Sequence, residues 1–545
     1  MQIQDTILGF KDKIDLPEWR PLQSTLSNSA AGACSAFDLR NDIEVANPYI
    51  WFMQALTTLN RYNVANDAWS EINAFTAVGG TLAAGAFCIF VPSHGISGTV
   101  GGTPTTTSFQ LATLQNSASA LLNQFANSGN NYGYKIRVIG NGAGGSGKIE
   151  ERFIIANTSG TTPIITLNTA LTFTPQTTDT YELLAGRIYI LGSGTTAAGF
   201  WKALDVATLK ISGNLTVTNL PSVIGTDTSG VMLDEQYVPY NRRPGEGYLG
   251  INTYDTGNFN GALQCLTATA SAAGTLTGQA TGGDAAVVAN EYRNFQIRIV
   301  EDTGIPTAVG QRRKITSHTA GASPIYTLYS NWTVTPSVTC KYVIEQNNNL
   351  LLMTGTNTVT YSYAAGGFLT DASWSTAAAS GGATQYANPG FANGAGVCIE
   401  SAFSIVKDKN GNVKPSFIYH LRGAASVSME YLDIAAGANG VWATIVPLDM
   451  TTVALTTGTC SAHDPSTNEG KYFYIQLNAT NRFFRFNMLN QVWEPWATDL
   501  PLTQSTAIVG GKIAISLALY GVTKITLLYQ IANTSNGFYN CLIQR

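Results

Sequence analysis

Charged residues are scarce in this 545-residue sequence. Asp, Glu, Lys and Arg make up 12 % of it, about half of the roughly 25 % usual in soluble proteins, and the formal net charge is −4. A chain with this balance has no overall basic field that would attract nucleic acid. The compact basic groups are Arg242–Arg243 and Arg312–Arg313–Lys314, and groups this small are typical of solvated loops. We therefore expect no extended nucleic-acid-binding surface.

Patterns that hold metals or disulfides are also missing. Seven cysteines stand at positions 34, 88, 265, 340, 398, 460 and 541, never in C-x-x-C spacing, which favours buried thiols. The four histidines, at positions 94, 318, 420 and 463, do not pair with one another or with acids at metal-site spacing. His463-Asp464 and Asp408 lie in turn-rich stretches that we interpret as hairpin loops. We expect no metal and no cofactor.

Long apolar runs are absent as well. No stretch of about 18 apolar residues occurs, and the first twenty residues, MQIQDTILGFKDKIDLPEWR, lack the apolar centre of a secretory signal peptide. We therefore expect a chain that neither spans a membrane nor leaves the cytoplasm through the Sec pathway.

The sequence is rich instead in Thr, Ser, Asn, Gln and Gly, with 54 glycines and 44 % hydrophobic residues. Branched side chains fit the pleated surface of a sheet, and glycine supplies the positive φ angles of tight turns. The 24 Tyr, 22 Phe and 9 Trp provide ample apolar surface for cores. The composition predicts a large, all-β protein built from several parts.

Residues 140–151, GNGAGGSGKIEE, contain the G-x-x-x-x-G-K core of a phosphate-binding loop in Gly142, Gly147 and Lys148. Position 149 is Ile, where such a loop needs Ser or Thr for the metal ion. The residues that follow, ERFIIANTSG, alternate like a strand and do not open a helix. The stretch therefore predicts a hairpin connection between two strands. We expect no nucleotide turnover, and we expect Lys148→Ala to leave assembly intact.

An internal repeat supports this interpretation. An offset of 161 positions places residues 134–182 on residues 295–343 without a gap. The matching positions are Ile136-Arg137 and Ile297-Arg298, Arg152 and Arg313, PIITL (163–167) and PIYTL (324–328), TFTP (172–175) and TVTP (333–336), and Tyr181 and Tyr342. The glycine stretch falls on EDTGIPTAVGQR (301–312), which has no G-K pair. The repeat predicts two copies of one small β-module with the same fold.

A second, looser repeat surrounds the modules. RYNVANDAW (61–69) and RFNMLNQVW (485–493) share Arg, an aromatic residue, two Asn and Trp at one spacing. Weaker versions occur at 186–211, 350–374, 417–442 and 511–538. The pattern is a strand, a turn, a second strand with an aromatic residue or Leu, and then a Trp that opens a third strand. It predicts that Trp69 and Trp493 are buried in equivalent places.

The pattern resembles the Kelch-type β-propeller blade, in which an aromatic residue and an Asp precede a Trp at similar spacing. The doubled glycine of Kelch blades is replaced here by single glycines such as Gly192 and Gly423. The resemblance implies about six blades with two inserted β-domains. We expect an N-terminal arm or closing strand (1–45), propeller segments (46–96, 186–257 and 346–545), β-module 1 (97–185) and β-module 2 (258–345). The arm would close the last blade or hold a neighbouring subunit.

A glycan hydrolase built on a propeller would need two carboxylates at a defined separation. The adjacent carboxylates Glu150–Glu151 and Asp234–Glu235 would point to opposite faces of a strand, which does not suit the paired acids of a glycosidase. The sequence contains no good sialidase Asp-box and no G-x-S-x-G nucleophile motif. We therefore expect no catalytic residues and no enzyme.

The sequence of the module resembles that of a small β-unit of tailed-phage structural proteins. The matching positions are Ile136-Arg137-Val138, Arg152, Thr166-Leu167, Thr172–Pro175 and Tyr181. A propeller with inserted β-domains is similar to the nozzle of short-tailed phages. This resemblance implies a virion protein of the tail or portal vertex, made in the host cytoplasm without a signal peptide. It also implies a homo-oligomeric ring, such as a hexamer, with portal, adaptor or tail proteins as partners and transient contact with phage DNA or the host surface. The alternative is a fibre, collar or capsid decoration that binds a host receptor or glycan.

Overall fold

The structure is a computed structural model, and its strands and the loops between many of them are described. The described residues are 20–24, 26, 34–37, 49–55, 58–64, 66–72, 85–91, 94–126, 134–192, 201–212, 215, 228–233, 252–254, 257–259, 262–279, 289–290, 292–293, 295–345, 349–354, 361–364, 373–376, 386–394, 397–402, 406–407, 413–414, 417–424, 426, 428–434, 436–437, 439–445, 455, 459–464, 472–477, 483–488, 491–495, 512–520, 523–531 and 538–544.

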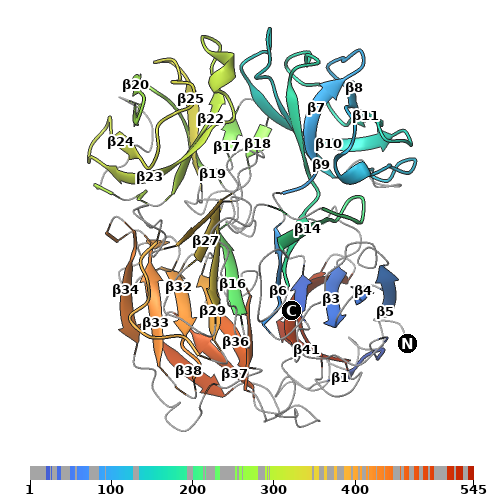
Figure 1. Ribbon diagram of the computed structural model, residues 1–545, viewed down its shortest axis with the longest axis vertical. Coiled ribbons are helices and arrows are strands. Elements are labelled where there is room, and N and C mark those ends of the chain that lie inside the picture. Colours follow the sequence, from blue (N-terminus) through green and yellow to red (C-terminus); the bar gives the residue numbers. More distant parts are fainter. Residues whose placement is uncertain are drawn as a thin grey trace.

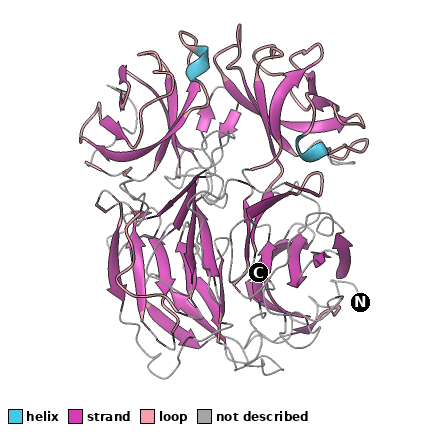
Figure 2. Cartoon of the chain, in the orientation of Figure 1, coloured by secondary structure: helices cyan, strands magenta, loops and turns pink. Residues whose placement is uncertain are grey.

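The described part is built from strands, as the composition predicts (Figure 2). The helical elements in it are two single 3-10 turns, η1 (Gln115–Ser117) and η2 (Pro306–Ala308). No helix in this part is long and apolar enough to cross a membrane. The all-β fold class is confirmed.

Six antiparallel sheets of four strands make up the lower half of the molecule in Figure 1. The first three are β2 (Cys34–Phe37), β3 (Tyr49–Ala55), β4 (Thr58–Asn63) and β5 (Ala68–Ile72); β6 (Phe87–Val91), β13 (Arg187–Leu191), β14 (Trp201–Asp205) and β15 (Lys210–Ile211); and β16 (Thr228–Leu233), β26 (Asn349–Thr354), β27 (Tyr361–Ala364) and β28 (Ser373–Thr376). The fourth and fifth are β29 (Cys398–Ala402), β32 (Phe417–Leu421), β33 (Met429–Asp433) and β34 (Val441–Ile445); and β35 (Cys460–Asp464), β36 (Tyr472–Gln476), β37 (Phe483–Asn487) and β38 (Val492–Pro495). The sixth joins β39 (Lys512–Tyr520), β40 (Thr523–Ile531) and β41 (Phe538–Gln544) to β1 (Arg20–Pro21).

The six sheets follow one another around a common centre. The first strand of each sheet lies next to the first strand of the following one, in the order β2, β6, β16, β29, β35, β39 and back to β2. Each sheet therefore presents one edge strand inward and packs its faces against two neighbours. This is the blade arrangement of a β-propeller.

The N-terminal segment takes part in two sheets. Arg20 and Pro21 pair with Asn540 and Tyr539, so β1 completes the sheet that contains the C-terminal strand. β2 also lies within residues 1–45 and is the inner strand of the first sheet, where Cys34 pairs with Met53. The described part of this segment thus contains both a closing strand and a strand of the first sheet.

Two further β-units form the upper half of the molecule (Figure 1). Module 1 is a closed barrel of β7 (Ser97–Gly101), β8 (Ser108–Leu111), β9 (Lys135–Ile139), β10 (Ile149–Asn157), β11 (Ile164–Leu167) and β12 (Thr180–Leu184). Module 2 is a seven-stranded sheet of β19 (Ala262–Thr267), β20 (Ala270–Ala272), β21 (Thr275–Thr277), β22 (Gln296–Glu301), β23 (Arg312–His318), β24 (Ile325–Leu328) and β25 (Lys341–Glu345). A short hairpin of β17 (Asn252–Tyr254) and β18 (Gly257–Phe259) precedes it.

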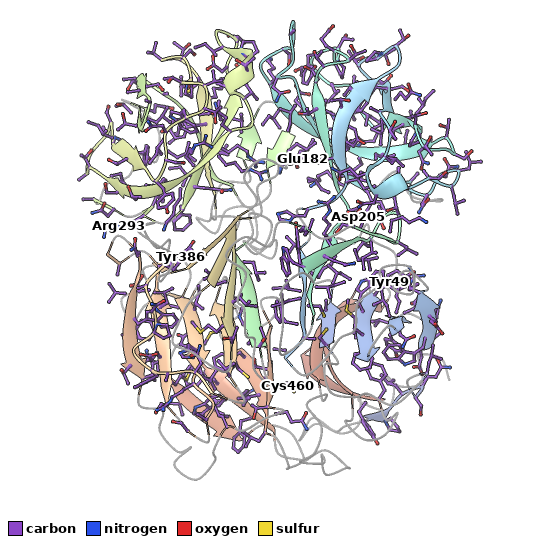
Figure 3. All side chains as sticks on the ribbon, viewed as in Figure 1. Tyr49, Glu182, Asp205, Arg293, Tyr386 and Cys460 are labelled. Carbon is purple, nitrogen blue, oxygen red and sulfur yellow. The ribbon has the colours of Figure 1, made fainter. Side chains whose placement is uncertain are left out.

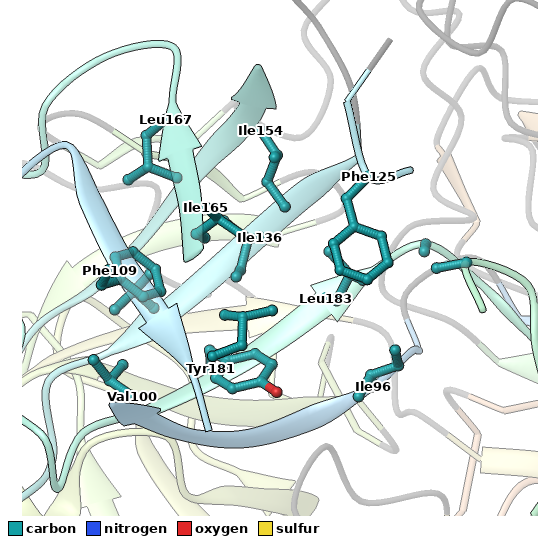
Figure 4. Packing of buried hydrophobic residues seen from close by; sticks show 14 of the residues in the cluster. Ile96, Val100, Phe109, Phe125, Ile136, Ile154, Ile165, Leu167, Tyr181 and Leu183 are labelled. Atoms are coloured by element: carbon teal, nitrogen blue, oxygen red, sulfur yellow. The ribbon is translucent and has the colours of Figure 1, made fainter. Parts of the chain in front are cut away.

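Four strands of the two modules correspond in position and pairing, β9 to β12 in module 1 and β22 to β25 in module 2. The 161-residue offset carries β11 onto β24 and β12 onto β25, residue for residue. Tyr181 pairs with Val138 in module 1, and Tyr342 pairs with Ile299 in module 2. Figure 4 shows the core of module 1, where Tyr181 is fully buried with apolar side chains from several strands. A one-residue slip would turn this core outward, so the equal register reflects equal folding.

Both modules are inserted in the propeller at the same place, between the first and second strands of a sheet. Module 1 lies between β6 and β13, and module 2 between β16 and β26. These are the first and second strands of two adjacent sheets. The next sheet has a small hairpin of β30 (Val406–Lys407) and β31 (Val413–Lys414) at the same place. The shared insertion point places the modules side by side on one face of the propeller (Figure 1).

The two tryptophans singled out in the sequence are buried alike. Trp69 pairs with Tyr62, and Trp493 pairs with Phe486, directly across neighbouring strands. The ring of Trp69 lies 5.1 Å from that of Phe538 in the adjoining sheet. Trp493 belongs to the apolar cluster that joins its sheet to the preceding one. The predicted burial is confirmed.

Candidate functional site at the interface between the modules

The glycine-rich stretch is a hairpin, as predicted. Ile139 and Ile149 pair across the antiparallel strands β9 and β10, and the glycines form the connection. The backbone N–H of Gly142 donates to the Asp179 carboxylate at 2.9 Å, so an internal acid binds this amide where a phosphate would bind in a nucleotide loop. Burial raises the pKa of Asp179, and this effect is larger than the lowering by the backbone N–H groups that donate to the carboxylate.

This hairpin contacts module 2 through its backbone. The N–H of Asp302 donates to the carbonyl oxygen of Gly147 at 2.7 Å, and Lys148 and Glu301 form an isolated β-bridge. Gly147 has a φ of +70°, and a Cβ placed there would lie 2.3 Å from the Asp302 carbonyl oxygen. Glycine at this position therefore permits the close approach of the two modules.

Apolar side chains support the contact. Ile139 and Ile149, both from module 1, belong to the buried cluster that forms the core of module 2. They occupy the end of the β9–β10 ladder next to the hairpin. The modules therefore share one continuous apolar core at this point.

A row of charged side chains runs across the same face of module 1. Arg137 stands between Glu151 on one neighbouring strand and Glu182 on the other. Its guanidinium lies 2.7 Å from Glu151 and 3.0 Å from Glu182, and all three side chains are buried. Figure 3 shows Glu182 between the two modules.

Module 2 has a different row at the equivalent positions. There Arg298 stands between Arg312 and Val343. The offset thus matches Arg137 with Arg298 but replaces both acids, Glu151 by Arg312 and Glu182 by Val343. Arg312 lies 3.7 Å from Glu182 of module 1. The two copies have diverged to complementary charge where they meet.

On the opposite face of β10, and of β23 in module 2, an arginine binds a neighbouring loop. Arg152 donates to the Ala170 carbonyl at 3.1 Å and forms an ion pair with Glu150 at 2.7 Å. Arg313 donates in the same way to the Asn331 carbonyl at 2.9 Å. Glu150 and its neighbour Glu151 therefore have separate partners, as expected for adjacent residues on a strand.

Each module is also fixed to the propeller. In module 1, Asn116 donates to Asp205 at 2.8 Å and Arg187 donates to Gln115 at 2.7 Å. In module 2, the ammonium group of Lys314 lies 4.5 Å from the ring centre of Tyr386. Burial lowers the pKa of Lys314 to about 7, an effect that the attraction between ring and cation opposes.

The structure corrects two interpretations of the sequence. Arg312–Arg313–Lys314 are not solvated loop residues, because they lie on β23 with Arg312 at the module interface and Lys314 buried. His463-Asp464 is not a loop either, because both residues end strand β35 and His463 is buried. Arg242–Arg243, Asp234–Glu235 and Asp408 lie outside the described residues.

The other three histidines lie within hydrogen-bonding distance of groups inside the protein. The ring of His94 lies 2.7 Å from the Tyr189 hydroxyl, and that of His420 lies 3.3 Å from Glu430. His318 accepts the backbone N–H of Tyr292 at 2.8 Å. Within the described ranges, no three His, Cys, Asp or Glu side chains gather as metal ligands would.

Replacing Gly147 with alanine is expected to loosen the contact between the modules. The positive φ alone costs about 1–2 kcal/mol for a residue with a Cβ, and the approach of Asp302 adds to it. Gly144→Ala is a matched control, because its φ is +77° and a Cβ there would meet nothing within 4 Å. Amide hydrogen exchange at Asp302 should accelerate in Gly147→Ala and stay unchanged in Gly144→Ala. Equal exchange in both variants would contradict the assigned role.

Comparisons with known proteins extend this picture. No protein-family model and no curated protein matches the chain. Among solved structures, the chain is similar to an α-L-arabinofuranosidase from Fusarium graminearum bound to an iminosugar inhibitor, at 9 % identity, with 96 % of each chain covered and a TM-score of 0.29. It is also similar to an α-L-arabinanase from Penicillium chrysogenum complexed with arabinobiose, at 8 % identity, 96 % coverage of each chain and a TM-score of 0.28.

These matches contradict one prediction made from the sequence. We expected a chain that is not an enzyme, whereas the similar structures are glycoside hydrolases. Local motifs of known hydrolases do not detect a pair of acids that lie on separate strands, because such acids have no fixed spacing in the sequence. The prediction that this chain is not an enzyme is therefore contradicted.

Proposed function

We propose that this chain is a structural component of a tailed-phage virion, with a place in a ring at the tail or portal vertex. In this proposal the six sheets are the blades of one Kelch-like propeller, and the two modules form a single head on it. The observation that carries the proposal is the insertion of two copies of one module at the same connection of adjacent sheets.

The contacts between the parts favour a rigid, mechanical role. The head is held together by a shared apolar core, by the Gly147–Asp302 backbone bond and by the charged rows. Both modules are also bonded to the propeller through buried or partly buried groups. Interfaces between inserted domains are often small and mobile, so this number of specific contacts supports a unit that holds its shape under load.

The ring and its partners follow from the resemblance to phage proteins and from the low charge. A surface with few charges suits protein contacts, because charged residues are depleted at the centre of interfaces. The partners would be portal, adaptor or other tail proteins, with transient contact to the DNA that passes the vertex. A fibre, collar or decoration that binds a host glycan is the alternative.

The mass of the purified protein in solution tests the proposal. We expect light scattering to give an integer multiple of the 57.9 kDa chain, and electron micrographs to show closed rings. Gold-labelled antibody against the protein should mark one vertex of the particle. A monomer at high concentration, or label spread over the capsid or along fibres, would overturn the ring and favour the receptor-binding alternative.

A further inference from the structure

The charged residues of module 1 lie on or next to three of its strands, β9, β10 and β12. Residues 72–134, which include β7 and β8, contain no Asp, Glu, Lys or Arg. Residues 153–178, which include β11, contain none either. The charged side chains lie instead on β9, on β12 and at the start of β10, where the charged row is.

Module 2 shows the same division. Residues 256–283, with β19, β20 and β21, lack Asp, Glu, Lys and Arg, and so do residues 315–340 with β24. The charged residues of its strands lie on β22, β25 and the first residues of β23, and Arg293, which precedes β22, lies at the lower lateral edge of the module (Figure 3). The outer strands of both modules, β8 and β11 in module 1 and β20, β21 and β24 in module 2, carry no charged residue.

The outer halves expose apolar side chains at matching places. Ile164 on β11 is 46 % exposed, and Ile325, its counterpart on β24, is 45 % exposed. Ile164 pairs with Gln110, and Ile325 pairs with Thr277, so each has a neutral polar residue as its cross-strand neighbour. Leu121 and Leu122 add a further apolar pair to module 1.

These two outer faces point away from each other. β11 and β24 lie at opposite lateral ends of the pair of modules (Figure 1), whereas β9 and β22 lie toward its middle. One chain therefore has two outer strand faces without charged residues, one at each end of its head: β8 and β11 in module 1, and β20, β21 and β24 in module 2.

We propose that the outer face of module 1 in one copy packs against the outer face of module 2 in the next copy. A charged partner would lose water at this face and find no ion to replace it. A second copy of this chain offers a face with the same lack of charge and the same Thr, Asn and Ile side chains. The contact also continues the arrangement within the chain, so that modules 1 and 2 alternate.

Two different faces that join head to tail form a heterologous interface, which closes into a ring when the rotation between subunits allows it. The inference rests on the proposed ring and identifies the surface that forms it. In a closed ring every outer face is covered, which accounts for apolar side chains that stay exposed in a single chain.

Opposite charges placed on the two faces test the pairing. The variants are Ile164→Lys, Ile325→Glu and the double substitution, and Val441→Lys is the matched control, because Val441 is 49 % exposed on β34 of the propeller. All three sites of change are exposed, so the fold should be kept, and circular dichroism checks this. Light scattering over a dilution series gives the concentration at which assembly occurs.

Each single variant should require at least a tenfold higher concentration for assembly, and the double variant should recover the wild-type value because Lys meets Glu. Val441→Lys should assemble as the wild type does. A wild-type monomer would overturn the ring and this inference together. A wild-type ring that the single variants leave intact would refute this interface alone. Loss of assembly without recovery in the double variant would show that the two faces do not meet.

Discussion

Replacing Arg137 with methionine is expected to lower the free energy of unfolding of module 1 by about 3–5 kcal/mol. The guanidinium binds two buried carboxylates, and its loss leaves Glu151 and Glu182 with contacts of 3.9 Å to Lys135 and 3.7 Å to Arg312. A buried charge without a close partner costs several kcal/mol, because the interior does not replace the water it has lost. Amide hydrogen exchange along β9 and β12 measures the effect in the full chain.

The matched control is Arg485→Met. Arg485 also binds a glutamate, Glu494 at 2.7 Å, but its side chain is 26 % exposed and that of Glu494 is 29 % exposed. An exposed pair of this kind contributes about 0.2–1 kcal/mol. Adding Glu151→Gln and Glu182→Gln to Arg137→Met should restore much of the lost stability, since the uncompensated charges disappear. Similar losses in Arg137→Met and Arg485→Met would contradict the importance of the buried row.

Replacing Trp493 with alanine is expected to lower the free energy of unfolding of the propeller by about 3–5 kcal/mol. The indole is buried and packs against Phe473 and Phe486, with ring centres 5.6 and 5.0 Å away. Truncation removes these contacts and leaves a cavity in the cluster that joins two sheets. Denaturant unfolding followed by tyrosine and far-ultraviolet signals measures the loss.

The corresponding change at Trp69 should have a similar cost, because its ring packs against Tyr62 and Phe538 at 5.1 Å from each. Trp69→Phe and Trp493→Phe keep an aromatic ring and should each lose less than half as much. A loss below about 1 kcal/mol in both alanine variants would mean that these rings do not hold neighbouring sheets together.

Much of the architecture can be predicted from the sequence because its parts repeat at regular spacings along the chain. The 161-residue offset preserves strand register, and the spacing from Tyr62 to Trp69 and from Phe486 to Trp493 turned out to mark residues paired across neighbouring strands. Such patterns survive because each strand face must match a core.

The charged interface was harder to predict, for a physical reason. Glu151, Arg137 and Glu182 are far apart in the chain and become neighbours only through the register of three strands. In the sequence the nearest acid to Glu151 is Glu150, which has a different partner in the structure. The signal was present in the repeat, where Arg137 matches Arg298 while Glu151 and Glu182 change to Arg312 and Val343.

The pairing of β1 with β41 has a consequence for biosynthesis. Pro21 meets Tyr539, which the ribosome adds more than five hundred residues later. At about 5–20 residues per second, roughly 25–100 s separate the two strands during translation. Until then the first-made strand has no partner, and the unpaired edges of the growing sheets are open to other nascent chains. A cell that makes this protein must therefore shield a partly built propeller for longer than most small domains take to fold.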